Sequence, residues 1–209
     1  MRKITALRTG KGQGKRVRIF LDGKQAFYLE TEVVVKEGLK VGQTLSTDQI
    51  EVLISKDSFQ RALSAAVHYI SYRPRSEFEL RERLGQRGVN GNAREEVITK
   101  LKEQGLIDDT AFAQFWKSSR QSYSPRSQWL TGLELKRKGV ADDIVNRVVD
   151  NIDDDDNAYR AALKKARSLP QSDYPVFRRR LGDYLQRRGF SYGVINHTIQ
   201  RLWQEQVSN

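Results

Sequence analysis

The side chains with the clearest chemical potential in this sequence are basic ones that recur at matching positions. Arg75 and Arg126 each follow a proline, and Arg87, Lys138 and Arg188 each precede a glycine. Regularly spaced cations suit the binding of phosphate groups or of an acidic protein surface. A simpler interpretation stays open for the residues before the glycines, because a cation in the last turn of a helix gains about 0.3–1 kcal/mol from the helix dipole.

The basic runs are longer than a helix end requires. Lys136, Arg137 and Lys138 are consecutive, and helical phase predicts that all three are exposed. Tyr72 and Tyr123, each two residues before a proline, are candidates for stacking on bases or for anchoring a protein. If the segments that carry the cations stack with a constant rotation, the cations form a stripe on one face. The complete set of candidate contact residues is Arg75, Arg81, Arg83, Arg87, Arg126, Lys136, Arg137, Lys138, Arg178, Arg179, Arg180, Arg187, Arg188, Tyr72 and Tyr123.

The sequence contains no arrangement of residues suited to catalysis or metal binding. It has no cysteine, and its two histidines, His68 and His197, are far apart. A metal site needs several ligands close together, and a nucleophilic serine needs a nearby base. The pairs Asp108-Asp109 and Asp142-Asp143 stand at expected helix starts, where N-capping explains them. We therefore expect a protein that is not an enzyme and that uses neither a cofactor nor a metal.

The glycine-rich stretch 10–15 resembles a phosphate-binding loop only in composition. The pattern GxxxxGK[ST] would need glycine where Thr9 stands, and serine or threonine where Arg16 stands. The residues that follow read as a strand, whereas a phosphate loop lies at the N-terminus of a helix. We interpret the stretch as a hairpin loop.

The net charge of +11 is unevenly distributed. Residues 1–107 and 158–209 carry an excess of basic residues, and residues 108–157 carry an excess of acidic ones. This pattern favours a partner that is a polyanion or is coated with one, although a basic protein without a nucleic-acid role stays an alternative. The N-terminal residues lack the apolar core of a signal peptide, and no apolar run approaches the roughly 18 residues that span a bilayer. We expect a soluble, cytoplasmic protein without membrane contact.

One sequence pattern occurs three times. YRPRSEFELRERLGQRGV, residues 72–89, returns as YSPRSQWLTGLELKRKGV, residues 123–140. A weaker third copy places Pro175 before Gly189 at the separation found in the first two copies. A repeat of this length is one supersecondary unit that buries its apolar face against its neighbours.

Each repeat reads as three helices. Pro74 ends one helix, Ser76 with Glu79 forms a predicted capping box, and Gly88 is a C-terminal cap. The basic segments also contain Tyr72, Phe78, Tyr123, Trp129, Tyr174 and Phe177, and most of the aromatic residues at helical apolar spacing are expected in the core. The expected helices are 59–71, 76–87 and 93–104 in the first repeat, 109–120, 127–138 and 141–151 in the second, and 158–168, 176–188 and 192–203 in the third.

The N-terminal residues read differently, as strands joined by a tight turn. Asp22-Gly23 predicts a type I′ hairpin, residues 33–37 predict a helical turn closed by Gly38, and Ser46 with Gln49 predicts a capping box. The expected strands are 4–7, 17–21 and 26–29. A helix that starts at residue 47 should connect this part to the repeats.

Together these elements predict a mainly α protein with a small N-terminal β cap. Its three tandem three-helix repeats should form an elongated curved array. The predicted domains are a β-rich extension with its connecting helix, 1–56, and three repeats, 57–107, 108–156 and 157–209.

These features resemble the RecX family of regulators of the RecA recombinase. The similarity rests on RPRSEFELRERLGQRGV, on GLIDDTAFAQFWKSSR and SPRSQWLTGLELKRKGV, and on IFLDGKQAFYLE followed by VVVKEGLKVGQTLS. It covers nearly the whole chain. The third repeat departs from the pattern, since Val176-Phe177 replaces the Arg-Ser that follows the first two prolines.

The resemblance implies a non-enzymatic inhibitor that lies in the groove of RecA filaments on single-stranded or double-stranded DNA. Such a protein restrains recombinase, ATPase and coprotease activity, and belongs to DNA repair and the SOS response. We expect weak direct binding to DNA and a monomer. The alternative is a stand-alone DNA-binding protein whose units act as helix-turn-helix modules, which predicts tight and strongly salt-dependent binding to bare DNA.

Overall fold

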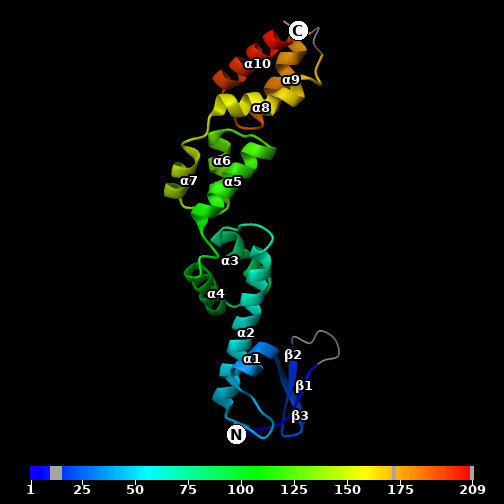
Figure 1. The fold of residues 1–209 in the computed structure, drawn as a ribbon, viewed down its shortest axis with the longest axis vertical. Coiled ribbons are helices and arrows are strands. Elements are labelled where there is room, and N and C mark those ends of the chain that lie inside the picture. The colour runs from blue at the N-terminus through cyan, green and yellow to red at the C-terminus, as the bar shows by residue number, and fades with distance from the viewer. Residues whose placement is uncertain (10–15, 171–172, 208–209) are drawn as a thin grey trace. The chain divides into compact units, whose positions relative to one another are not determined.

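The computed structural model describes residues 1–9, 16–170 and 173–207, with side chains as far as residue 205. The ribbon is mainly helical and begins with a small β-sheet, which confirms the predicted fold class of helical repeats behind a β cap (Figure 1). The hairpin loop predicted for residues 10–15 lies outside the described residues.

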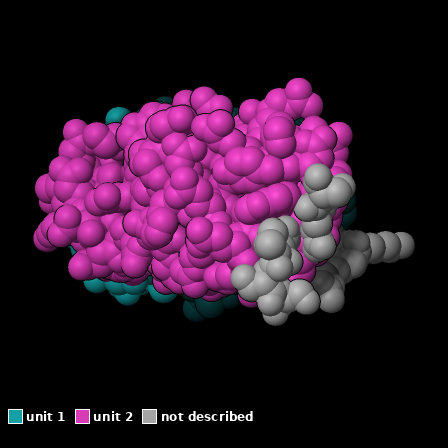
Figure 2. Space-filling model, turned by 90° about the horizontal axis from the view of Figure 1, so that it is seen from above, with its two compact units in different colours: residues 1–73, 80–106 teal, residues 74–79, 107–209 magenta. Residues whose placement is uncertain are grey.

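The chain forms two compact units, which Figure 2 colours separately. The first contains residues 1–73 and 80–106, and the second contains residues 74–79 and 107–209. The predicted division into four domains is a finer one and stays a proposal.

The first unit starts with a four-stranded antiparallel sheet. Its strands are β1 (Arg2–Thr9), β2 (Arg16–Leu21), β3 (Lys24–Glu30) and β4 (Thr44–Leu45), in the spatial order β3-β2-β1-β4. Asp22 and Gly23 have φ values of 50° and 79°, so the predicted tight turn between β2 and β3 is confirmed. The two-residue strand β4 was not predicted.

The sheet packs on two helices of the first unit. α1 (Thr31–Lys36) ends before Gly38, whose φ of 61° confirms the predicted glycine cap. α2 (Thr47–Ile70) contributes Asp57, which is 4% exposed and accepts a hydrogen bond from Glu30 N. This carboxylate therefore ties the end of β3 to α2.

α2 is one continuous helix, so the prediction of a connecting helix followed by a separate helix from residue 59 is wrong. Ser46 forms the predicted capping box: its Oγ accepts from Gln49 N at 3.1 Å, and Gln49 Oε1 accepts from Ser46 N at 2.8 Å. Neither proline nor glycine occurs between Ser46 and Pro74, so no residue interrupts the helix. α3 (Glu77–Gln86) and α4 (Gly91–Glu103) follow, and α4 packs against α2.

The second unit contains two groups of three helices. α5 (Asp109–Tyr123), α6 (Gln128–Arg137) and α7 (Asp142–Val149) pack around a core that includes Phe112 and Leu135. α8 (Asp154–Ala166), α9 (Tyr174–Gln186) and α10 (Tyr192–Val207) pack around a core that includes Phe177 and Leu181. Both groups match the three-helix pattern predicted for the second and third repeats.

Two buried serines in the second unit each donate a hydrogen bond to the carbonyl oxygen of the residue before a repeat glycine. Ser76 Oγ donates to the carbonyl oxygen of Lys138 at 2.7 Å, and Ser127 N donates to the carbonyl oxygen of Arg188 at 3.1 Å. Both serines are fully buried, and each Oγ also accepts from a backbone N–H in the first turn of its own helix at 3.1 Å. We call these two contact regions the first joint, at Ser76, and the second joint, at Ser127.

A glycine packs closely at each joint. Gly139 and Gly189 have φ values of 75° and 86°, which glycine adopts without strain. A Cβ atom at Gly139 would lie 2.3 Å from Phe78 Cβ, and one at Gly189 would lie 2.6 Å from Leu130 Cβ. Gly88, the matching glycine of the first repeat, has a similar φ of 74° but open space around it. The turns after α6 and α9 therefore pack on the first turns of α3 and α6.

An aspartate completes each joint. Asp109 Oδ1 accepts from Glu77 N at 2.8 Å, and Asp154 Oδ1 accepts from Gln128 N at 2.7 Å. Burial raises the pKa of Asp154 above its usual value, against the opposing effect of this hydrogen bond. These carboxylates satisfy N–H groups that no helix can pair internally.

The third copy of the pattern starts its helix differently. α9 begins at Tyr174, so Pro175 lies inside its first turn, and Asp173 is the N-cap. In α3 and α6 the helix begins only after the proline and the serine. The first turn of α9 therefore lacks the serine that organises both joints.

Candidate partner-binding surface

The predicted contact residues of α3 differ in their surroundings. Arg81 donates from Nε and Nη2 to the carboxylate of Glu95 at 3.0 and 2.7 Å, and this bonding lowers the pKa of Glu95 below its usual value. The guanidinium of Arg83 lies over the ring of Tyr69, 5.7 Å from its centroid. Arg87 is exposed near the end of the helix. Arg81 is therefore paired with Glu95, whereas the side chains of Arg83 and Arg87 are exposed.

Two further candidates stand near the turn before α3. Tyr72 is 71% exposed, and its hydroxyl lies 3.2 Å from His68 Nε2. Arg75 is half-buried between Pro74 and Ser76. Tyr72 therefore presents most of its ring to solvent, and Arg75 presents only part of its side chain.

Glu134 on α6 gathers three donors of the second repeat. Its Oε2 accepts from Trp116 Nε1 and from Arg120 Nε, both at 2.8 Å, and its Oε1 accepts from Arg126 Nη1. The carboxylate side chain is only 12% exposed. The guanidinium of Arg120 also lies over the Trp116 ring, 4.5 Å from the centroid. Glu134 therefore links α5 with α6 and with the turn between them.

Arg126 is an internal partner of this cluster. Burial is the main cause that lowers the pKa of Arg126, and the charges of Arg120 and Arg188 lower it further. Its guanidinium pairs with the carboxylate of Glu134, a contact that the spacing of residues in the sequence did not indicate. Contact of Arg126 with a partner stays a prediction.

Lys138 is not the exposed cation that helical phase predicts. Its Nζ lies 2.6 Å from Glu79 Oε1 and 4.4 Å from the centroid of the Trp116 ring, and its side chain is 21% exposed. The first joint causes this difference, because it brings the end of α6 against the first turn of α3. Lys136 and Arg137 are exposed as predicted.

Arg188 has the corresponding position at the second joint. Its Nη1 donates to Ser124 Oγ at 2.9 Å and to the carbonyl oxygen of Pro125 at 3.2 Å. Its guanidinium lies over the ring of Tyr184, 4.5 Å from the centroid. The residues before the second and third repeat glycines therefore hold joints together. In the predicted stripe of cations, Arg126, Lys138 and Arg188 are therefore not fully exposed.

α9 carries the densest group of exposed candidates. Arg178, Arg179 and Arg180 are consecutive and exposed, and Arg187 is exposed just after the last residue of the helix. Arg178 Nη2 donates to the hydroxyl of Tyr192 at 3.4 Å, which is a long hydrogen bond. We call these four residues the α9 arginine cluster.

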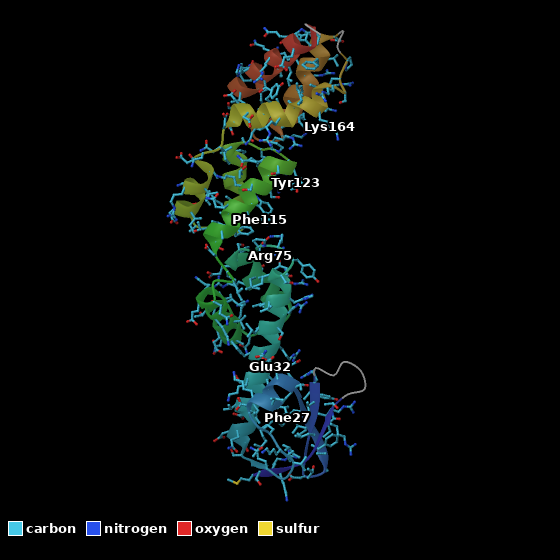
Figure 3. The ribbon with its side chains drawn as sticks, in the orientation of Figure 1. Phe27, Glu32, Arg75, Phe115, Tyr123 and Lys164 are labelled. Carbon is cyan, nitrogen blue, oxygen red and sulfur yellow. The ribbon has the colours of Figure 1, made fainter. Side chains whose placement is uncertain are left out.

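Exposed aromatic rings accompany the cations in the second repeat. Tyr123 is 89% exposed at the end of α5, where Figure 3 labels it. Trp129 is 66% exposed, although most aromatic residues at helical apolar spacing were expected in the core. Phe78 is 44% exposed, and each of these two rings lies beside the glycine of a joint. Lys164, on α8, is an exposed cation that the sequence pattern did not single out (Figure 3).

The described ranges were searched for two other kinds of site. In residues 1–9, 16–170 and 173–207, no group of three or more histidine, cysteine, aspartate or glutamate side chains is placed to hold a metal ion. No helix in the same ranges is both long and apolar enough to cross a membrane.

Family models match three parts of the chain. The N-terminal domain of regulatory protein RecX matches residues 2–46, and the first and third three-helix domains of RecX match residues 62–101 and 153–199. The regulatory protein RecX of Bacillus pumilus is 30% identical over 206 residues, which cover 97% of this chain and 78% of that protein. The chain belongs to the RecX family. The regulatory protein RecX of Bacillus velezensis is 32% identical over 206 residues, 95% of this chain and 76% of that protein.

Solved RecX structures have the same fold. A crystal structure of regulatory protein RecX superimposes with a TM-score of 0.67 at 25% identity, covering 94% of this chain and 98% of that one. A crystal structure of RecX from Lactobacillus salivarius has a TM-score of 0.60 at 25% identity, covering 70% of this chain and 97% of that one. The RecX name identifies this family as one of regulatory proteins.

Proposed function

We propose that this RecX-family chain is a non-enzymatic inhibitor of the RecA recombinase that binds RecA filaments on DNA. It acts as a monomer in the cytoplasm and restrains recombination and coprotease activity. The family relationship supports the regulatory role. The observation that carries the binding role is the α9 arginine cluster, which combines four exposed guanidinium groups in one short stretch.

The chemistry of these groups suits a partner made of protein and DNA. Guanidinium groups pair with carboxylates and with phosphates through the same planar set of donors. Exposed rings such as Tyr123 and Trp129 add large contact areas at low entropic cost. Binding of this kind inhibits by occupying a surface and requires no reacting group on the regulator.

A titration on two substrates tests the proposal. The full chain is added to bare DNA and to the same DNA coated with RecA, at two salt concentrations. We expect at least tenfold tighter retention on the coated DNA and a loss of recombinase activity at matching concentrations. Equal affinity for bare DNA and for RecA-coated DNA would contradict the proposal.

The same titration identifies the alternative function. A stand-alone DNA-binding protein binds bare DNA tightly, and its affinity falls steeply with salt in proportion to the number of phosphates neutralised. The internal contacts of these cations disfavour this alternative. They remove Lys138 at the first joint, and Arg126 and Arg188 at the second joint, from phosphate contact.

A further inference from the structure

A pocket of about 480 Å³ lies between α9 and α10. Phe190, Ile195 and Ile199 line it and are at most 8% exposed, so they form its floor. Gly182 also lines the pocket, and a Cβ atom there would lie 3.8 Å from Ile199 Cδ1. The missing side chain at Gly182 therefore leaves room beside the floor. An apolar floor of this kind favours a ligand that inserts an apolar group.

The edge of the pocket is positively charged. Arg178 and Arg179 line it and are exposed, and Asp183 is the one carboxylate among the lining residues that the structure describes. Tyr192, also at the edge, is 72% exposed. A hydrogen bond with Asn196, and then the charge of Arg178, lower the pKa of the Tyr192 hydroxyl below its usual value. The edge therefore favours a ligand with negative charge around its apolar group.

The position of the pocket in the repeat explains why it is open. In the first two repeats, Ser76 and Ser127 at the start of the corresponding helix donate hydrogen bonds to the backbone of a later turn and so form the joints. In the third repeat, Pro175, Arg178 and Arg179 at the same end of α9 are exposed. The end of the helix that binds a neighbouring repeat in α3 and α6 is thus accessible to another protein in α9.

We propose that this pocket binds an acidic peptide segment of a partner protein. One apolar side chain of the segment lies on the floor, and its carboxylates meet Arg178 and Arg179. The inference rests on the proposed function and deepens it, since the segment belongs to the protein that the regulator controls. Duplex DNA offers phosphates but no apolar group for the floor of Phe190, Ile195 and Ile199, and binding of an unpaired base there is one outcome of the test below.

Peptide binding to the full chain tests the inference without a filament. The probe is a short synthetic peptide with acidic residues on both sides of one phenylalanine, and binding is followed by fluorescence anisotropy. We expect the variant Arg178→Glu/Arg179→Glu to bind at least tenfold more weakly. The matched control is Lys164→Glu/Arg167→Glu, which changes the net charge equally at exposed residues that do not line the pocket. The control should lose less than twofold.

A second peptide tests the floor. Replacement of its phenylalanine by serine should weaken binding to the unchanged protein at least tenfold, because the apolar anchor is lost. Equal weakening by both pairs of charge reversals, or an affinity that does not depend on the phenylalanine, would overturn the inference. It would also fail if oligothymidylate, and not the peptide, bound in a manner that depends on Arg178 and Arg179.

The two proposals can fail separately. If the wild-type chain binds the peptide as described but does not inhibit RecA, the pocket stands and the proposed function falls. If the wild-type chain inhibits RecA but binds neither peptide, the proposed function stands and the pocket inference falls.

Discussion

The second and third repeats carry basic residues in matching helices but use them differently. In the second repeat, Arg126 pairs with Glu134 and Lys138 pairs with Glu79. In the third, Arg178 to Arg180 lie exposed on α9. The difference lies in nearby carboxylates: Glu134, on α6, and Glu79, on α3, reach the cations that flank α6, whereas Arg178 to Arg180 stay exposed. The type and spacing of a basic residue therefore do not tell whether its charge is available to a partner.

Arg188 shows that the position of a cation within its repeat also decides whether the cation is used inside the protein. It belongs to the third repeat, yet its guanidinium donates to Ser124 and to the carbonyl oxygen of Pro125. Residues before the repeat glycine hold a joint wherever a preceding repeat contributes its Pro-Arg-Ser turn. In α9, Arg178, Arg179 and Arg180 lie in the first half of the helix and are exposed.

The largest expected effect on stability tests how closely the first joint is packed. Gly139→Ala adds a methyl group against Phe78 at a positive φ, so it should lower the free energy of unfolding by about 3 kcal/mol. Gly88→Ala has a similar φ but open space, and should cost about 1 kcal/mol. Urea unfolding followed by circular dichroism measures both. Equal costs would mean that the first joint is loosely packed.

Removal of the shared carboxylate should have the next largest effect. Glu134→Ala leaves Arg120, Arg126 and Trp116 without their acceptor, so we expect a loss of about 2–3 kcal/mol in the free energy of unfolding. Glu134→Gln keeps an acceptor of the same size and should lose less. The same urea titration applies, and an unchanged midpoint for Glu134→Ala would show that the cluster does not hold the second repeat.

Two adjacent cations give a matched comparison within the second repeat. Lys138→Glu sets a second carboxylate beside Glu79 and removes the cation from the Trp116 ring, at a cost of about 2 kcal/mol. Arg137→Glu makes the same change in charge at an exposed side chain, and its thermal midpoint should equal that of the unchanged protein. Equal midpoints for the two variants would contradict the structural role of Lys138.

The smallest effect on stability is expected on α9. Reversal of Arg178, Arg179 and Arg180 to Glu should leave the free energy of unfolding unchanged, because these side chains are exposed. The same variant should lose at least tenfold in affinity for RecA-coated DNA, measured by the titration described above. A stable variant with full affinity would show that the α9 arginine cluster is not the binding surface. The cations of the third repeat would then not differ from those of the second in their use by a partner.

Local signals in the sequence predicted much of the fold. Ser46 with Gln49 gave the start of α2, Asp22-Gly23 gave the hairpin, and Gly38 gave the end of α1, because each acts on backbone groups within a few residues. The start of α9 was missed. Asp173 lies before Pro175 and starts the helix earlier than the serine pattern of the other two copies indicated.

The candidate surface was predicted less completely than the fold. Tyr72 and Tyr123 were expected at the surface and are exposed there. Phe78 and Trp129 are exposed too, although most aromatic residues at helical spacing were expected in the core. Helical spacing identifies an apolar position without showing what covers it. The pocket between α9 and α10 depends on Gly182 and on residues from two helices, and no pattern within one helix indicates it.

The amino-acid sequence by itself determined the repeat, the helix ends and the class of protein, because prolines, caps and glycines act locally and because the repeated motifs are shared with the RecX family. Only the tertiary structure decided which cations stay available. Glu79 lies 59 residues from Lys138 along the chain, and Ser124 lies 64 residues from Arg188. The joints bring these groups together, so a charge that looks free in the sequence becomes part of the scaffold when the repeats pack.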